Sequence, residues 1–211
     1  MKLAIFDLDG TLNRTDLFAV PAALKALREF GSPVDDPNVI RGTFGMDPFT
    51  YTKIYFPEAE PEFVRKYLDR AAQLENEMML EYGKPFDGIP AALESIRNSG
   101  VKTAVCSNAS MRYIVQVLST LNLLDLFDFI QPMIRDLSKN ESLRALLERV
   151  KPERAVMVGD RIFDLDAARA NGIPFIGCLY GFCPEEMETS DLCVNSAAEL
   201  PEAVAGLLKR V

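Results

Sequence analysis

Short apolar segments that alternate with helix-like segments are the feature that most restricts how this chain can fold. The apolar runs span residues 2–6, 101–106, 127–131, 155–158, 175–178 and, with a weaker pattern, 192–194. Three of the runs are uniformly apolar, as expected for strands that are covered on both faces. Strand-like runs separated by helical patterns predict a parallel sheet with helices on both sides.

A helical block interrupts this alternation after the first run. Helices between the strand-like runs are predicted at residues 90–98, 110–121, 140–150, 165–170 and 197–208. Residues 14–85 contain no convincing strand, and their helical patterns span residues 16–30, 37–41, 47–54 and 61–82. The sequence therefore predicts an α/β protein, with a Rossmann-like core of residues 1–13 and 86–211 and an inserted α-helical cap domain of residues 14–85.

Histidine is absent from the 211 residues. Its absence excludes histidine acid–base catalysis, Ser-His-Asp triads and most zinc sites. Any chemistry must therefore use carboxylates, hydroxyls, lysines, thiols or a hard metal ion. The net charge of −8 argues against nucleic acid or an acidic membrane surface as a partner. For the same reason, a phosphorylated substrate would need local cations in its binding site.

The cysteines and the apolar segments predict a cytoplasmic protein. The four cysteines form neither a CxxC pair nor a metal-ligand spacing, and we expect them to be reduced, mostly buried thiols. The N-terminal apolar run is too short for a secretory signal, and a carboxylate interrupts it. No segment approaches the roughly 20 apolar residues that span a bilayer.

Polar side chains follow the predicted strands at the end where ligands of a parallel sheet bind. They are Asp7 and Asp9 after the first run, Ser107 and Asn108 after the second, Asp160 and Asp164 after the fourth, and Lys139 before the helix that leads into the fourth. Clustered carboxylates repel one another unless a cation lies between them, and Mg²⁺ suits a few carboxylates together with a substrate phosphate. Ser107 and Lys139 would then contact phosphoryl oxygens.

These groups resemble, in order along the chain, the four motifs of the haloacid dehalogenase superfamily. The stretch Phe6-Asp7-Leu8-Asp9-Gly10-Thr11-Leu12 is similar to the first motif, Ser107-Asn108 to the second, Lys139 to the third, and Gly159-Asp160-Arg161-Ile162-Phe163-Asp164 to the fourth. A helical block directly after the first motif resembles the branch with an α-helical (type 1) cap, which includes phosphoglycolate-phosphatase-like proteins. The resemblance covers the core and implies a phosphatase.

The resemblance also implies a mechanism. Asp7 would attack phosphorus and form an aspartyl phosphate, and Asp9 would protonate the leaving oxygen and later deprotonate water. The superfamily's dehalogenases lack an acid at the position of Asp9, because a departing halide needs no proton. The expected reaction is the Mg²⁺-dependent hydrolysis of a small phosphomonoester of the phosphoglycolate, sugar phosphate or nucleotide type.

The remaining implied roles concern the metal ion and the phosphate. Mg²⁺ would be bound by the carboxylates of Asp7 and Asp160 and by the backbone carbonyl of Asp9. Asp164 would support the metal's water shell or orient Lys139. The phosphoryl group would be held by Ser107, Lys139 and the backbone N–H of Asn108.

Two positions depart from the family pattern. No proline follows Lys139 closely, and Arg161 stands where relatives often have threonine. Arg161 would place an additional cation next to Asp160. This cation could alter substrate preference, or the side chain could point into solvent.

Each residue also has a structural interpretation. Asp7 and Asp9 could cap a turn, Ser107-Asn108 could form a strand-to-helix turn, Asp164 could cap a helix and Lys139 could be a surface lysine. The order and convergence of the residues favour the site. The acidic cluster Glu185, Glu186 and Glu188 is interpreted as a solvated helix.

The predicted cap contains a glycine-flanked loop from Arg41 to Gly45. Arg41 and Phe44 of this loop, together with Lys53, are the candidates for substrate specificity. Two other functions stay open at this point. One is a phosphomutase of the β-phosphoglucomutase type, in which the aspartyl phosphate re-phosphorylates an intermediate. The other is a non-catalytic regulatory protein that keeps the fold, although intact Asp7 and Asp9 argue against it.

Overall fold

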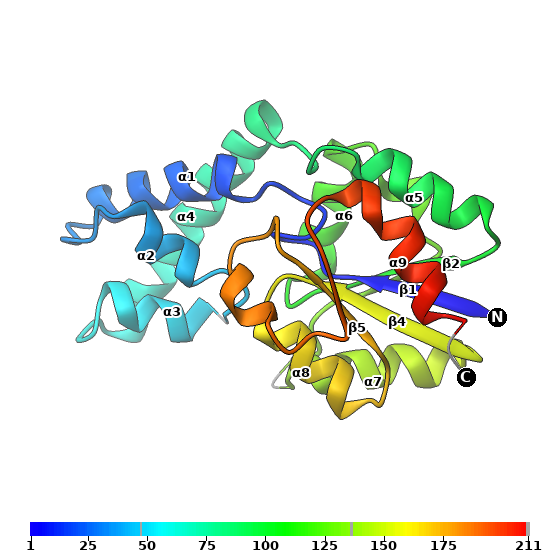
Figure 1. The fold of residues 1–211 in the computed structure, drawn as a ribbon. Coiled ribbons are helices and arrows are strands. Elements are labelled where there is room, and N and C mark those ends of the chain that lie inside the picture. Colours follow the sequence, from blue (N-terminus) through cyan, green and yellow to red (C-terminus); the bar gives the residue numbers. More distant parts are fainter. Residues whose placement is uncertain (47, 136, 210–211) are drawn as a thin grey trace. The chain divides into compact units, whose positions relative to one another are not determined.

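The structure, a computed structural model, describes residues 1–46, 48–135 and 137–209. The chain divides into two compact units (Figure 1). The first unit consists of Met1–Asn13 and Pro85–Val211, and the second of Arg14–Lys84. The predicted domain boundaries lie within one residue of these bounds. The roles of the units as catalytic core and cap stay predictions.

The first unit is an α/β unit built around one sheet. Its strands are β1 (Lys2–Phe6), β2 (Lys102–Cys106), β3 (Phe129–Gln131), β4 (Arg154–Gly159), β5 (Phe175–Cys178) and β6 (Leu192–Val194). Its α-helices are α5 (Ile89–Asn98), α6 (Met111–Thr120), α7 (Lys139–Val150), α8 (Ile162–Ala170) and α9 (Leu200–Leu207), and its short 3₁₀ helices are η1 (Leu124–Leu126), η2 (Pro184–Met187) and η3 (Ala197–Glu199). Within the described residues the strands form one parallel sheet, which confirms the predicted Rossmann-like fold class.

The strand order places the topological switch point of the sheet between β1 and β4. The order is β3-β2-β1-β4-β5-β6, so the chain runs outward from β1 to β3 and then returns to start outward again from β4. Ligands of open parallel sheets bind at such a switch point, beyond the carboxyl ends of the strands. Phe6 pairs with Val105 of β2 and with Val158 of β4, so the residue after Phe6 emerges between both neighbouring strand ends.

Helices cover both faces of the sheet, as Figure 1 shows for α5 and α9 on one side of β1 and β4 and for α7 and α8 on the other. Side chains alternate along a strand. Leu3 and Ile5 pack in the core beneath α7 and α8, and Ala4 and Phe6 therefore face the opposite layer. All four are fully buried, which explains why the first strand is apolar on both faces.

Several elements begin at different residues from those predicted. The third strand starts at Phe129 and not at residue 127, because Phe127 ends η1 and packs edge-on against Phe6, with ring centroids 6.2 Å apart. The predicted C-terminal helix is divided into η3 and α9. Pro201 stands in the first turn of α9, where a missing N–H is tolerated but continuation of an earlier helix is not.

The second unit is helical, as predicted. Its helices are α1 (Asp16–Glu29), α2 (Pro37–Gly42), α3 (Pro48–Tyr55) and α4 (Pro61–Tyr82). The predicted start of the third of these helices, residue 47, lies outside the described residues. The unit has its own aromatic core, in which Tyr67 of α4 is fully buried and contacts Phe30, Tyr55 and Phe56 with ring centroids 5.0–6.3 Å apart.

All four cysteines lie among the described residues, and each is a free thiol; three of them are buried. In the part of the chain that the structure describes, no helix combines the length and the apolar character needed to cross a membrane.

A charged cluster ties β2 to the segment before β3. The Asp128 carboxylate lies 2.7 Å from both Arg97 and Lys102, and it accepts the backbone N–H of Thr103 at 3.0 Å. Partial burial raises the pKa of Asp128, but the hydrogen bonds from Lys102 and Thr103 and the charges of Arg97 and Lys102 outweigh it and lower the pKa below its ordinary value. The ionised form of this side chain therefore stabilises the fold.

We expect Asp128→Asn to lower the free energy of unfolding by about 1 kcal/mol at pH 7, because the amide loses the charge on which these contacts depend. A lowered folded-state pKa adds stability above the unfolded-state pKa of about 3.9, and this stability is lost as the pH falls through the folded-state value. Urea unfolding between pH 7 and pH 3 should show the difference shrinking in acid. Asp125→Asn, at an exposed neighbouring position, is the control, and a pH-independent difference would contradict this expectation.

Candidate active site

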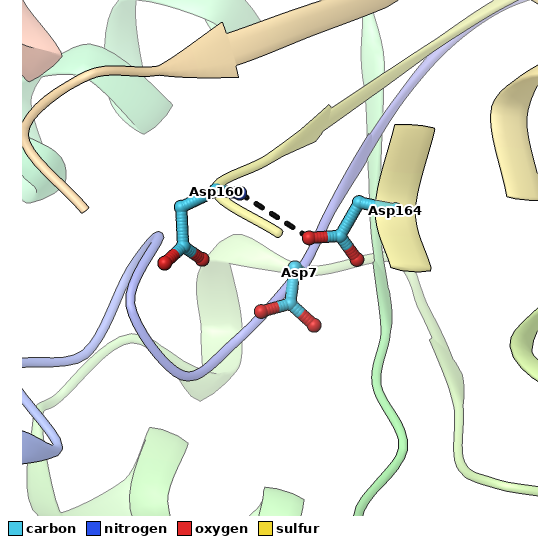
Figure 2. A group of neighbouring side chains, drawn as sticks. All are labelled: Asp7, Asp160 and Asp164. Carbon is cyan, nitrogen blue, oxygen red and sulfur yellow. Dashed lines mark hydrogen bonds between the residues drawn. The ribbon is translucent and has the colours of Figure 1, made fainter. Parts of the chain in front are cut away.

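Three buried carboxylates meet at the carboxyl ends of β1 and β4. Asp7 follows β1, Asp160 follows β4, and Asp164 lies in the first turn of α8. One carboxylate oxygen from each residue lies within 4.8 Å of the other two, and Figure 2 shows the three side chains grouped around one point. The sequence predicted that Asp7 and Asp160 would share a metal ion and that Asp164 would only support it. In the structure all three carboxylates lie within reach of one ion.

The Asp160 carboxylate is held on both oxygens. The hydroxyl of Thr11 donates to Oδ1 at 3.0 Å, and the backbone N–H of Phe182 donates to Oδ2 at 2.9 Å. Two glycines let the backbone come this close, since a Cβ atom on Gly10 or Gly181 would overlap the Asp160 side chain. Gly10 also has a φ of +94°, which other residues rarely adopt.

Asp164 connects the start of α8 to the cluster. Its Oδ2 accepts the backbone N–H of Asp160 at 3.2 Å, drawn as the dashed line in Figure 2, and that of Arg161 at 3.1 Å. Asp164 therefore caps α8 and also belongs to the site, because its Oδ1 lies 2.5 Å from Nζ of Lys139. A Cβ on Gly159 would overlap the Asp164 side chain, so this turn also requires glycine.

Lys139 supplies the cation that faces the carboxylates. It is the first residue of α7, it is buried, and its ammonium group pairs with Asp7 and Asp164. A cation at a helix N-terminus is unfavourable for the helix dipole, and burial adds a further cost. Burial lowers the pKa of Lys139, but the charges of Asp164 and Asp7 outweigh this effect and hold the pKa above its ordinary value.

The site carries excess negative charge. Three carboxylates and one ammonium group give −3 + 1 = −2 when all are ionised. Burial, together with the charges of Asp164 and Asp160, raises the pKa of Asp7 despite Lys139, and burial with the charge of Asp164 raises the pKa of Asp160 to about 7. A divalent cation with oxygen ligands fits this donor set, because it would offset both excess charges.

Ser107 and Asn108 follow β2, next to the end of β1. Ser107 is buried, its N–H donates to the carbonyl of Gln131 at 3.1 Å, and its hydroxyl accepts the N–H of Ala109 at 3.1 Å. The hydrogen bond from Ala109 uses only a lone pair of the Ser107 hydroxyl, so its hydrogen is still available to be donated to an anion. The structure therefore places Ser107 at the edge of the sheet where phosphate contacts were predicted.

The side chain of Asp9 is not part of the acidic cluster. Its Oδ1 accepts the Asn13 side-chain amide at 3.0 Å and the hydroxyl of Tyr113 at 3.2 Å. The sequence assigned only the backbone carbonyl of Asp9 to the metal ion, and this assignment stays a prediction. Asn13 and Tyr113 were not predicted. The short spacing from Asp9 to Asn13 was a usable signal, whereas Tyr113 lies 104 residues away.

The specificity candidates belong to the second unit. Arg41 lies in α2, and its guanidinium donates to the Asn38 side chain at 3.1 Å. Phe44 packs against the core of the second unit. Lys53 of α3 is exposed. Their role toward a substrate stays a prediction.

The interpretation of Glu186 as part of a solvated helix is wrong. Glu186 lies in η2, and its carboxylate accepts the Nε–H of Arg161 at 3.1 Å and the backbone N–H of Ile162 at 2.6 Å. The side chain of Arg161 is 7% exposed, so it does not point into solvent. The sequence gave no signal for this pair, because the two residues are 25 positions apart.

The fold and the site together define a class of protein: an α/β enzyme with buried carboxylates at the switch point of a parallel sheet. The family profile described as haloacid dehalogenase-like hydrolase matches residues 4–178. The chain therefore belongs to the haloacid dehalogenase-like hydrolase family. The resemblance inferred from the four motifs is confirmed, and so is the predicted enzyme class, a phosphatase.

Individual relatives match over nearly the whole chain. A phosphoglycolate phosphatase from Aquifex aeolicus (strain VF5) is 29% identical over 206 residues, which is 95% of both chains. The tyrosine-protein kinase PtkA of Mycobacterium bovis is 30% identical over 95% of this chain and 70% of its own length. A crystal structure of a predicted phosphatase from Clostridium acetobutylicum has a TM-score of 0.85, with 26% identity and coverage of 98% of this chain and 99% of the other.

We expect Gly159→Ala to reduce phosphatase turnover by about tenfold or more, because the added methyl group would displace Asp164 and its contact with Lys139. Steady-state hydrolysis of a chromogenic phosphate ester and thermal unfolding would be measured together. Gly206→Ala is the matched control, since a Cβ at this helical glycine meets open space. Wild-type turnover in the Gly159 variant would show that the position of Asp164 is not critical.

Proposed function

We propose that this chain is a Mg²⁺-dependent phosphomonoesterase that acts on small phosphorylated metabolites through an aspartyl phosphate on Asp7. The observation that carries the proposal is the meeting of Asp7, Asp160 and Asp164 with Lys139 at the switch point of the sheet. A nucleophile beside a cation site and a fixed ammonium group would make use of all four side chains.

The metal ion would be held by the carboxylates of Asp7 and Asp160, with the backbone carbonyl of Asp9 as a further oxygen ligand and Asp164 at the edge of the site. Mg²⁺ bound there supplies positive charge that neutralises the carboxylates and the substrate phosphate. Without such a cation, an incoming phosphate dianion would meet a site of the same sign, in a chain whose net charge is −8.

In the first half of the reaction, a carboxylate oxygen of Asp7 forms a bond to phosphorus while the bond from phosphorus to the ester oxygen breaks. The ester oxygen leaves as an alcohol with the proton of Asp9. Lys139 and Ser107 contact the phosphoryl oxygens, where negative charge lies during transfer. Lys139 is already fixed by Asp7 and Asp164, so little reorganisation is needed.

In the second half, Asp9 accepts a proton from water as the water oxygen bonds to phosphorus. The bond between phosphorus and Asp7 then breaks, inorganic phosphate leaves, and Asp9 is protonated again for the next cycle. The hydrogen bonds from Asn13 and Tyr113 hold Asp9 in one orientation, which suits a group that must serve both the leaving oxygen and the water.

The substrate class is a phosphoglycolate, a sugar phosphate or a nucleotide. The full-length relative named phosphoglycolate phosphatase supports the first of these. Arg41, Phe44 and Lys53 of the second unit are the side chains that we expect to select among them. A mutase reaction of the β-phosphoglucomutase type would use the same Asp7 but would release no phosphate in net turnover.

Replacement of Asp7 tests the proposal most directly. A hydrolysis screen across phosphorylated metabolites should find at least one substrate for the wild type in Mg²⁺, and Asp7→Asn should lower its kcat by about 10⁴-fold or more, because the amide cannot form the intermediate. Chelation should abolish turnover, and added Mg²⁺ should restore it. Asp166→Asn, at an exposed position of α8, is the control.

Three results would count against the proposal. Turnover that survives Asp7→Asn would exclude the aspartyl phosphate, and turnover that survives chelation would exclude the metal ion. Isomerisation of a sugar phosphate that requires a bisphosphate activator and releases no net phosphate would indicate the mutase. Release that is linear in time without an activator supports hydrolysis.

A further inference from the structure

The N-terminus of α8 is capped by a residue from a distant loop. Arg161 is the N-cap residue, and N-cap positions usually carry a side chain with an acceptor oxygen, which a guanidinium group lacks. Glu186, from the β5–β6 loop (residues 179–191), takes this role, because its carboxylate accepts the backbone N–H of Ile162 at 2.6 Å. The carboxylate also lies where the helix dipole favours a negative charge.

Arg161 and Glu186 form a two-point pair. Nε of Arg161 lies 3.1 Å from Oε2 of Glu186, and Nη2 lies 3.4 Å from Oε1. The guanidinium carbon lies 5.3 Å from the centre of the Phe163 ring, over its face. The side chains of Arg161 and Glu186 are only 7% and 25% exposed, so solvent screens the pair less than it would screen a surface ion pair.

The same loop contacts the Asp160 carboxylate. The N–H of Phe182 donates to Oδ2 of Asp160, and Gly181 approaches so closely that a Cβ would overlap the Asp160 side chain. Phe182 lies between two anchors of the loop, the hydroxyl of Tyr180, which donates to the carbonyl of Thr11 at 3.1 Å, and the carboxylate of Glu186. The second anchor binds the loop to the residue that directly follows Asp160.

We infer that Arg161 and Glu186 are positioning residues that hold the β5–β6 loop against Asp160 and so fix the orientation of this carboxylate for Mg²⁺. The inference rests on the proposed metal site. It assigns a role to the arginine that stands where relatives often have threonine: Arg161 offers the N–H groups of α8 no side-chain acceptor, and it pairs instead with a distant carboxylate that accepts the Ile162 N–H and fastens the loop as well. Groups that orient metal ligands typically change metal affinity by about 10- to 100-fold when they are removed.

Direct binding of Mg²⁺ to the whole 211-residue chain without substrate, measured by titration calorimetry, tests this role. We expect Glu186→Ala to raise the Kd for Mg²⁺ by about tenfold or more. The rate of hydrolysis should fall at low Mg²⁺ and recover as Mg²⁺ saturates the site. Glu185→Ala, at the exposed neighbouring position, should leave the Kd within about twofold of the wild-type value.

The double variant Arg161→Thr/Glu186→Ala separates positioning from capping. Arg161→Thr supplies a hydroxyl that can cap α8 locally, so thermal stability should recover relative to Glu186→Ala. The Kd for Mg²⁺ should stay raised, because the loop has lost its anchor. Recovery of both stability and Mg²⁺ affinity in the double variant would overturn the inference and leave Glu186 as a helix cap alone.

The outcome for the wild type distinguishes the two proposals. If the wild type binds Mg²⁺ and Glu186→Ala binds it equally well, only the positioning role falls. If the wild type binds no Mg²⁺, the proposed function and the positioning role fall together.

Discussion

Repulsion among three buried carboxylates is the constraint on which the rest of the first unit depends. Asp7, Asp160 and Asp164 are buried and lie within reach of one ion. Burial and the neighbouring carboxylates therefore raise the pKa values of Asp7 and Asp160. Lys139 offsets only part of this charge. A divalent cation with oxygen ligands fits the two negative charges that remain when all three carboxylates are ionised.

The local structure around the cluster follows from how closely the backbone must approach it. Gly10, Gly159 and Gly181 stand where a side chain would overlap a carboxylate. Lys139 occupies the first turn of a helix, a poor place for a cation, because α7 points that residue at Asp7 and Asp164. These choices lower the intrinsic stability of their elements, and the sheet and its buried strands compensate for them.

The two units depend on different physical interactions. The sheet unit combines an apolar interior with a polar site at one edge, whereas the second unit is held by packed aromatic rings around Tyr67. A unit with its own core can vary its surface side chains without affecting the carboxylate cluster. This separation agrees with the proposal that side chains of the second unit select the substrate.

The sequence by itself determined the sheet, the inserted helical unit and most of the cluster. Apolar runs fix where strands end, and in a parallel sheet the residues that follow them share one edge, so Asp7, Ser107 and Asp160 could be placed without coordinates. Only the tertiary structure decided which side chains hold Asp160, Asp9 and Arg161. Thr11, Tyr113 and Glu186 act on residues 149, 104 and 25 positions away. Such contacts depend on how helices and loops pack, and a distant hydrogen-bond partner leaves no periodic or local pattern in the chain.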